Sequence, residues 1–311
     1  MTVVSKSKNI EFPSIKKIKF QPFYLKRVIM SLNLLTTTAG ENGRFRLPET
    51  EIIRSGARGE IRYSDINSLL AFTVNRQDSD SWLEGNTMNE ILASFAAFLK
   101  DDRNVAVDSN ALHGLIQCYM KNGFVDDDSY DRFLEMFSAV PLSPNQQRHP
   151  AAGKLKNLFA AKDSAFHIPI NHPERSHWNF GLILPEKRLI IVHDPLFIER
   201  RVKQIGSALF EFCKREAGTD TELMSDWGIQ KSIKHPQQTD TVNCGVFTLI
   251  SSIRAMCFIK QNRCHELLQD WNFPHSDLNI MDYRKRFAKI LLNDDKELEM
   301  KRFVNMFSLK T

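Results

Sequence analysis

Two apolar runs joined by a short polar turn constrain the fold more than any other part of the sequence. The runs are HWNFGLIL at residues 177–184 and LIIVHD at residues 189–194, and the letters PEKR separate them. Apolar runs of this length, bounded by turn residues, are typical of β-strands. We therefore predict an antiparallel hairpin at the centre of the fold.

The register of this hairpin decides which side chains meet. A turn centred between Pro185 and Glu186 would place His177 directly opposite Asp194. Paired residues of an antiparallel ladder share a face and have Cβ atoms about 4.5 to 5.5 Å apart, so the carboxylate could orient the imidazole. His193 would point to the other face, because side chains alternate along a strand.

Other segments carry helical patterns. NTMNEILASFAAFL at residues 86–99 has apolar residues at helical spacing, and Thr87 and Glu90 form a capping-box pattern. CGVFTLISSIRAMCF at residues 244–258 predicts a buried helix. The acidic run VDDDSYD at residues 125–131 lacks the glycine and spacing of a calcium loop, and we interpret it as a helix start. Strands that alternate with helices predict an α/β fold.

The first fifty residues differ in charge from the rest. They hold nine basic and three acidic residues, so they carry more than the whole net charge of +5. The nearly neutral remainder gives no electrostatic reason to expect a nucleic-acid partner. TTTAGENGRF at residues 36–45 is typical of a linker. We expect a basic N-terminal extension over residues 1–58 and one main domain over residues 59–311. Within the extension, SIKKIKF is interpreted as a solvated arm, with nuclear import or anion binding as the alternative.

The cysteines and the apolar content indicate the class of protein. The five cysteines are scattered and odd in number, which favours reduced thiols over a disulfide framework. Cys118 and Cys257 are expected in the core, and no spacing is typical of a zinc site, so we expect no metal and no cofactor. No apolar run approaches the roughly 18 residues that span a membrane, and no secretory signal is found. We expect a soluble protein.

The polar stretch HPQQTDTVNCGVF ends where the predicted buried helix begins, at Cys244. A thiol at a helix N-terminus is close to the positive end of the dipole, and a neighbouring imidazolium lowers its pKa further, which favours the nucleophilic thiolate. His177 and Asp194 would supply a base and a group that orients it. Gln238 could donate to a developing oxyanion beside the backbone amide of Cys244. Taken singly, each residue also has an ordinary role, in the core, at a strand end or in a loop.

Several of these segments resemble a known family. FHIPINHPERSHWNFGLIL, the aspartate of VHDPL and PQQTDTVNCGVF are similar, in order and spacing, to the catalytic segments of the ubiquitin-like-protein proteases. This is the Ulp/SENP group of cysteine proteases, which process and remove SUMO. SWLEGNTMNEIL resembles the family's substrate-side WL segment, and MDYRKRFAKIL resembles its C-terminal helix. The resemblance covers most of residues 80–292.

The resemblance implies a fold and a set of roles. The fold is α/β and papain-like, with a central mixed sheet flanked by helices, where the sheet carries the histidine and aspartate and a helix carries the cysteine. Position by position, Cys244 is the nucleophile, His177 the general base, Asp194 its orienting partner and Gln238 the oxyanion donor.

The resemblance also implies a substrate channel. Trp178, with Trp82, would wall a narrow passage for a Gly-Gly tail, although either tryptophan could instead be a core residue. The sequence departs from the family at two places. Asn243 stands where the family usually has aspartate, and Glu84-Gly85 stands where the WL segment usually continues with Asn-Asp. Neither change touches the triad, but both bear on substrate preference.

We therefore expect a monomeric cysteine isopeptidase that cleaves after the C-terminal Gly-Gly of SUMO or another ubiquitin-like modifier. Two alternatives stay open: an effector-type acetyltransferase on a related scaffold, and a non-catalytic modifier-binding pseudoenzyme. The first would need an acetyl-CoA site, which the sequence does not reveal. The modifier and its conjugates are the expected partners, in the nucleus or cytoplasm, or in a host cell that receives the protein as a pathogen effector.

Overall fold

The computed structural model describes residues 51–56, 58–70, 82–137, 154–155, 157–172, 177–220, 222–231, 237–268 and 277–307. The chain divides into two compact units, Met1–Arg46 and Leu47–Thr311, and every described residue belongs to the second. The basic arm and the linker at residues 36–45 lie outside the described residues. The boundary expected near residue 58 stays a prediction.

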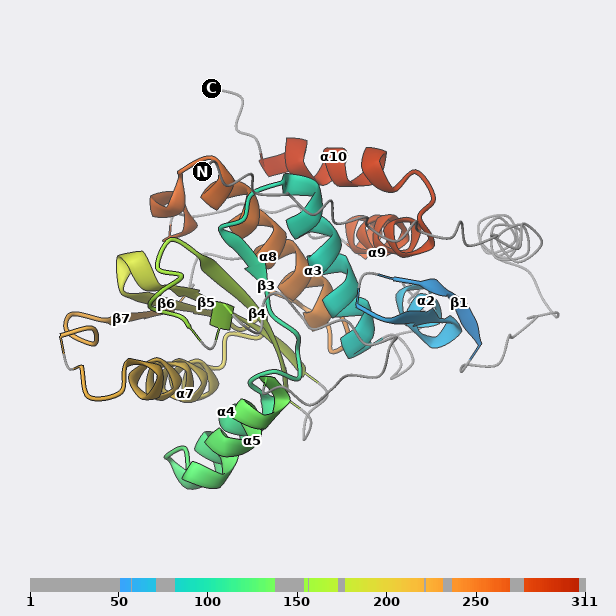
Figure 1. Ribbon diagram of the computed structural model, residues 1–311. Helices are drawn as coiled ribbons and strands as arrows, with labels where there is room; N and C mark the ends of the chain where they lie inside the picture. Colours follow the sequence, from blue (N-terminus) through green and yellow to red (C-terminus); the bar gives the residue numbers. More distant parts are fainter. Residues whose placement is uncertain are drawn as a thin grey trace, which may run out of the picture. The chain divides into compact units, whose positions relative to one another are not determined.

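A five-stranded mixed sheet forms the centre of the second unit (Figure 1). Its order is β3-β4-β5-β6-β7, with the outer pairs parallel and the inner pairs antiparallel. The middle strand is buried along its whole length, as its continuous apolar run predicts. The predicted α/β fold with a mixed central sheet is therefore confirmed. The strands are β3 (Asn104–Ala106), β4 (Ala165–His172), β5 (His177–Leu184), β6 (Leu189–His193) and β7 (Gly228–Lys231).

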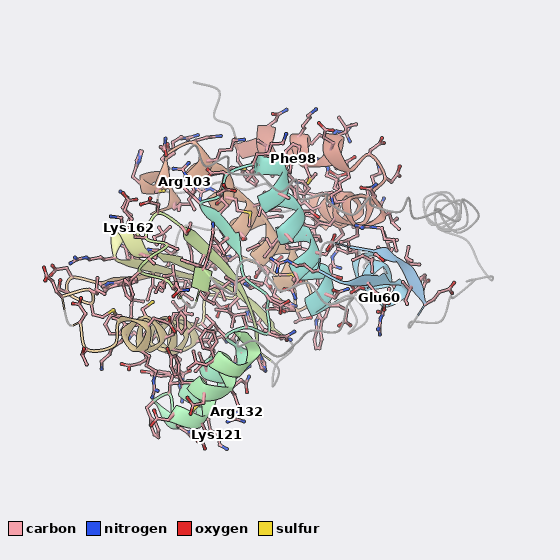
Figure 2. The ribbon with its side chains drawn as sticks, in the orientation of Figure 1. Glu60, Phe98, Arg103, Lys121, Arg132 and Lys162 are labelled. Atoms are coloured by element: carbon pink, nitrogen blue, oxygen red, sulfur yellow. The ribbon has the colours of Figure 1, made fainter. Side chains whose placement is uncertain are left out.

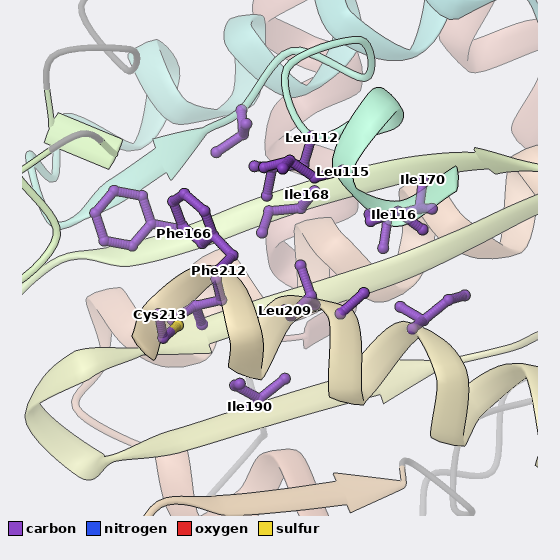
Figure 3. Close-up of a cluster of buried hydrophobic side chains, with 14 of the residues drawn as sticks. Leu112, Leu115, Ile116, Phe166, Ile168, Ile170, Ile190, Leu209, Phe212 and Cys213 are labelled. Carbon is purple, nitrogen blue, oxygen red and sulfur yellow. The ribbon is translucent and has the colours of Figure 1, made fainter. Parts of the chain in front are cut away.

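Helices cover both faces of the sheet (Figure 1). On one face α7 packs against the strands together with α4 and α5, and their apolar side chains form a continuous core. Figure 3 shows side chains of α7, such as Leu209 and Phe212, directed at the strand residues Ile168 and Ile190. The acidic run does begin a helix, as predicted. These helices are α4 (His113–Asn122), α5 (Asp127–Phe137) and α7 (Glu199–Ala217).

The opposite face is covered by a helix that is buried all round. Every residue of α8 from Cys244 to Ile259 is buried, because the sheet lies on one side and other helices lie on the rest. This confirms the predicted buried helix. Its neighbours are α3 and α10, and α9 and α2 continue the layer. They are α2 (Tyr63–Leu70), α3 (Gly85–Leu99), α8 (Cys244–Lys260), α9 (Asp277–Leu292) and α10 (Lys296–Phe307).

Helix α3 confirms the amphipathic prediction but not its capping box. The helix begins at Gly85, and Glu84 at the N-cap makes no side-chain capping bond. The Thr87 hydroxyl instead donates to the backbone oxygen of Asp65 at 3.2 Å. Glu90 accepts from the backbone N–H of Arg58 at 2.9 Å. Both side chains bond to residues outside the helix and not to its first turn, so the capping interpretation was wrong.

A short hairpin, β1 (Ile52–Ser55) and β2 (Glu60–Arg62), precedes these helices. It is anchored by Glu90 of α3, whose side chain is 1% exposed and pairs with Arg54 at 3.5 Å. Two short 3-10 helices, η3 (Pro185–Lys187) and η4 (Cys264–Leu268), complete the described elements.

The β5–β6 hairpin forms, but its register differs from the prediction by two residues. Leu184 pairs with Leu189 and Phe180 pairs with His193, so His177 and Asp194 are not directly opposite. The cause is the 3-10 turn η3, which ends at Arg188 in the left-handed conformation with φ 48°. It moves the centre of the turn one residue along the chain. A shift of two positions keeps every side chain on its predicted face.

The remaining sequence expectations concern surface, cysteines and membranes. None of the five cysteines, all of which lie within the described residues, forms a disulfide, and Cys118 and Cys257 are buried as predicted. Charged side chains such as Lys121, Arg132 and Lys162 lie on the surface (Figure 2). Among the described helices, none has the length and apolar character that crossing a membrane requires.

Candidate active site

Cys244 is the first residue of α8 and is held there by the turn before it. The Asp240 side chain accepts from the backbone N–H groups of Val242 and Asn243, both at 2.8 Å. Its other oxygen accepts from the Asn243 amide at 2.8 Å. An aspartate that bonds to the backbone two and three residues ahead stabilises a tight turn. The turn thus fixes where the helix begins.

The glycine after the cysteine allows α3 and α8 to approach closely. A Cβ atom added to Gly245 would lie 3.0 Å from side-chain atoms of Leu83. That spacing is tighter than ordinary van der Waals contact. Leu83 belongs to the WL segment just before α3, so Gly245 lets that segment lie directly against the start of α8.

The thiol of Cys244 is buried, and its acidity differs from the sequence expectation. Burial raises the pKa of the Cys244 thiol to about 11. Backbone hydrogen bonds from Trp178 and Gly245 and the charge of Arg284 act in the opposite direction, but they do not outweigh burial. The expected lowering of the thiol pKa was therefore wrong, because removal from water is the larger influence. A thiolate here needs a base to take the proton.

Two of the predicted site residues meet directly. Nε2 of His177, at the start of β5, lies 2.7 Å from Oδ1 of Asp194, just after β6. Both side chains are almost fully buried, at 4% and 0% exposed. The even shift in register explains the contact, since both residues stay on one face and meet diagonally instead of directly across.

Further donors stabilise Asp194 as a carboxylate. Its oxygens accept from the backbone N–H groups of Leu196 at 2.9 Å and Ile198 at 3.2 Å, and it pairs with Arg201 at 3.2 Å. Burial alone would raise the pKa of Asp194, but the bonds to His177 and Leu196 and the charge of Arg201 outweigh it and lower that pKa. The ionised carboxylate accepts the hydrogen bond, so Nε2 of His177 carries the proton and Nδ1 is left to act as a base.

Gln238 lies in the loop between these two parts of the site. Its backbone N–H donates to the Pro195 carbonyl at 2.9 Å, which ties the loop to the segment that follows Asp194. Its side-chain Nε2 donates to the Asp240 carbonyl at 2.7 Å. An amide carries two N–H donors, so the second is available for another acceptor.

Both tryptophans hydrogen-bond to segments beside Cys244. Trp178 is buried, and its indole N–H donates to the Leu83 carbonyl at 2.8 Å. Trp82 is partly exposed, and its indole N–H donates to the Thr241 carbonyl at 3.2 Å. The WL segment is thereby connected on one side to the strand of His177 and on the other to the turn before the cysteine.

Sequence reasoning missed three residues of this site: Arg201, Asp240 and Arg284. Arg201 pairs with the carboxylate, Asp240 shapes the turn, and Arg284 donates to that turn from α9. For the two arginines, the available signal was a basic residue inside an amphipathic helical segment, which favours burial with a partner. It did not reveal the partner.

A cavity of about 920 Å³ includes among its lining residues the direct neighbours of the His177–Asp194 pair: His172, which is opposite His177 in the β4–β5 ladder, and Arg201, which pairs with Asp194. It is lined by α4, α5 and the start of α7. Cys244 does not line it. Among the described residues, no group of three or more histidine, cysteine, aspartate or glutamate side chains is arranged to hold a metal ion.

The arrangement has the parts of a nucleophilic site. A thiol lies at a helix N-terminus, backbone N–H groups of Trp178 and Gly245 bond to it, and a histidine is oriented by a buried carboxylate. Such groups suit covalent catalysis by cysteine on an acyl substrate.

Comparison with known proteins places this geometry in context. The model of the Ulp1 protease family, C-terminal catalytic domain, matches residues 101–289. No curated protein matches the chain significantly. Among solved structures, the SUMO protease Ulp1 with its catalytic cysteine oxidised to a sulfinic acid has a TM-score of 0.53 at 15% identity, over 86% of this chain and 95% of that one. The C-terminal Ulp1 protease domain in complex with Smt3, the yeast ortholog of SUMO, has a TM-score of 0.50 at 15% identity, over 88% of this chain and 95% of that one.

Proposed function

The chain belongs to the Ulp1 protease family, and we propose that it is a cysteine protease that cleaves after the C-terminal Gly-Gly of SUMO or another ubiquitin-like modifier. The observation that carries this proposal is the 2.7 Å hydrogen bond between His177 and Asp194. The next residue in the strand, Trp178, donates its backbone N–H to the Cys244 thiol. A family fold without an oriented histidine would be compatible with binding alone. The oriented histidine favours catalysis over the pseudoenzyme alternative.

The proposed reaction begins with proton transfer from the thiol. Asp194 holds Nε2 of His177, so Nδ1 accepts the proton of Cys244 as the sulfur attacks the carbonyl carbon of the terminal glycine. The imidazolium then gives this proton to the departing lysine amine. Water, activated by the same histidine, hydrolyses the thioester and releases the modifier and the free thiol.

Two donors would stabilise the oxyanion formed in both steps. The backbone N–H of Cys244 is in the first turn of α8, close to the positive end of the helix dipole. The free N–H of the Gln238 amide is the second donor. Its other N–H is held by the Asp240 carbonyl, which restricts the rotation of the amide.

The substrate tail would enter between the two tryptophans. Trp178 and Trp82 hydrogen-bond to segments that flank Cys244, and flat aromatic faces suit a pair of glycines. SUMO is the first modifier to test because a structural relative was solved with Smt3. Glu84 and Gly85 follow Trp82 closely in the chain and depart from the family pattern, so they are the first positions to examine for modifier preference.

The cellular partners follow from the proposed substrate. We propose that the chain acts as a monomer on modifier precursors and conjugates, in the nucleus or cytoplasm of the cell that contains them. The alternative is that a pathogen delivers the protein into the host cell as an effector, where it would act in the same compartments.

A turnover assay tests the proposal. SUMO and ubiquitin, each with a fluorogenic amide at the C-terminus, are incubated with the wild-type protein, Cys244→Ala and His177→Gln. We expect turnover of at least one modifier by the wild type and a loss of at least about 10³-fold in both variants. Turnover that persists in folded Cys244→Ala would contradict the assignment of the nucleophile. No turnover by folded wild type would favour the binding or acetyl-transfer alternatives.

A further inference from the structure

Arg284 of α9 is a buried guanidinium behind the nucleophile. It is 1% exposed and donates to three oxygens: Nε to the Asn243 side chain at 2.6 Å, Nη1 to the Ser68 carbonyl at 2.8 Å and Nη2 to the Val242 carbonyl at 3.2 Å. Two of these acceptors immediately precede Cys244. A single side chain therefore connects α9 and α2 to the start of α8.

The electrostatics of this contact involve the thiol itself. Burial lowers the pKa of Arg284 to about 9, and the charges of Asp240 and Cys244 act against that lowering. The influence is mutual, because the charge of Arg284 lowers the pKa of the Cys244 thiol whereas that of Asp240 raises it. The acid on α2, Asp65, directs its carboxylate instead to Asn86 at 2.9 Å. Burying a charged group costs desolvation free energy, and the buried charge of Arg284 interacts with the thiol.

Asn243 acts as a neutral bridge between the two charges. Its oxygen accepts from Arg284, and its Nδ2 donates to Asp240 at 2.8 Å. Aspartate at this position would form a direct ion pair with the guanidinium and would add a negative charge next to the sulfur. The asparagine leaves the positive charge of Arg284 available to the thiol.

We propose that Arg284 is a positioning residue for Cys244, which fixes the turn before α8 through Val242 and Asn243 and favours the thiolate through its charge. The role of Cys244 as nucleophile comes from the proposed function. The effect on the thiol does not depend on any substrate, so the two ideas can fail separately.

The test measures how fast Cys244 is alkylated by iodoacetamide at a series of pH values, with the site quantified by peptide mass spectrometry. The variants are Arg284→Gln and the matched control Arg286→Gln, which removes a surface arginine of the same helix that pairs with Asp282 at 2.7 Å. The partly exposed Cys264 is the internal reference. The midpoint of the pH dependence reports the thiol pKa separately from access to the sulfur.

We expect the midpoint for Cys244 to rise by about one unit in Arg284→Gln, which is a tenfold lower thiolate fraction at a given pH, and to stay unchanged in Arg286→Gln. Asn243→Asp should raise it too, because the added carboxylate opposes the thiolate. A folded Arg284→Gln protein with the wild-type midpoint overturns the proposal.

If Arg284→Gln does not fold, Arg284→Lys decides. Lysine keeps the charge but cannot reproduce the planar fork that contacts Asn243, Val242 and Ser68 together. We then expect a smaller rise in the midpoint, and a wild-type midpoint overturns the proposal. If the midpoint shifts as expected in the Arg284 variants but the wild type turns over no modifier, the result would contradict the proposed function and support the role of Arg284.

Discussion

Replacement of Asp194 by asparagine should destabilise the folded protein strongly. The side chain is 0% exposed and pairs with Arg201, which is 6% exposed, at 3.2 Å. Asparagine keeps an oxygen for one of the N–H groups of Leu196 and Ile198 but removes the counter-charge of the arginine. Breaking a buried pair from one side costs about 3 to 5 kcal/mol. Because part of the hydrogen bonding survives, we expect a loss of about 3 kcal/mol in the free energy of unfolding.

Urea unfolding followed by circular dichroism measures this loss. The control is Glu199→Gln, since Glu199 forms a surface pair with Lys203 at 3.5 Å in which both side chains are more than half exposed, and it should cost less than about 0.5 kcal/mol. The double variant Asp194→Asn with Arg201→Met removes both charges, so it should be more stable than the sum of the single effects by about 1 kcal/mol or more. A loss below about 1 kcal/mol in Asp194→Asn, or strict additivity in the double variant, would refute the reasoning.

Three further predictions follow from the described contacts. The pKa of Asp194 is lowered in the folded state, so the ionised carboxylate stabilises the fold fully above the unfolded pKa near 4, and this stabilisation is lost as pH falls through the folded pKa. The difference in the free energy of unfolding between wild type and Asp194→Asn should therefore narrow over that pH range in unfolding titrations. A difference that does not depend on pH would contradict this. Gly245→Ala should destabilise the protein by about 1 to 3 kcal/mol, because the added Cβ would be too close to Leu83. Gly114→Ala, whose Cβ meets nothing within 4 Å, should be neutral or stabilising in thermal melts. Equal effects of the two substitutions would argue against close packing at Gly245. His167 is fully buried and its pKa is lowered to about 3, so its ring resonances should not move between about pH 5 and 8 in NMR spectra, and a titration there would show that the ring is accessible to water.

The lengths, boundaries and apolar patterns of the segments made the elements of the fold predictable. The run at residues 177–184 was confirmed as a strand because it is short, apolar and bounded by turn residues, and the run at residues 244–258 was confirmed as a helix because it is too long for an ordinary strand and has apolar residues at helical spacing. The register of the hairpin was wrong by two positions. Nothing in PEKR indicates that Arg188 would adopt a positive φ and lengthen the turn. The meeting of His177 with Asp194 survived because the shift is even.

The site was predictable as a set of residue types but not as an environment. The helix N-terminus and a neighbouring imidazolium predicted a lowered pKa for the Cys244 thiol, whereas the fold buries the sulfur and raises that pKa. Arg284 lies 41 residues from Asn243 in sequence and 216 from Ser68, so no local pattern could reveal that it joins them. The partners of the capping residues Thr87 and Glu90 were missed for the same reason.

We propose that Cys244, assisted by His177 and Asp194, attacks the C-terminal carbonyl of a ubiquitin-like modifier. The most direct measurement is the reaction of the purified chain with SUMO, ubiquitin and related modifiers that carry a thiol-trapping group at the C-terminus, followed by mass mapping of the modified cysteine. We predict an adduct at Cys244 with at least one modifier, absent in Cys244→Ala. A folded protein that forms no adduct, or forms it at another cysteine, would contradict the assignment of Cys244 as the nucleophile.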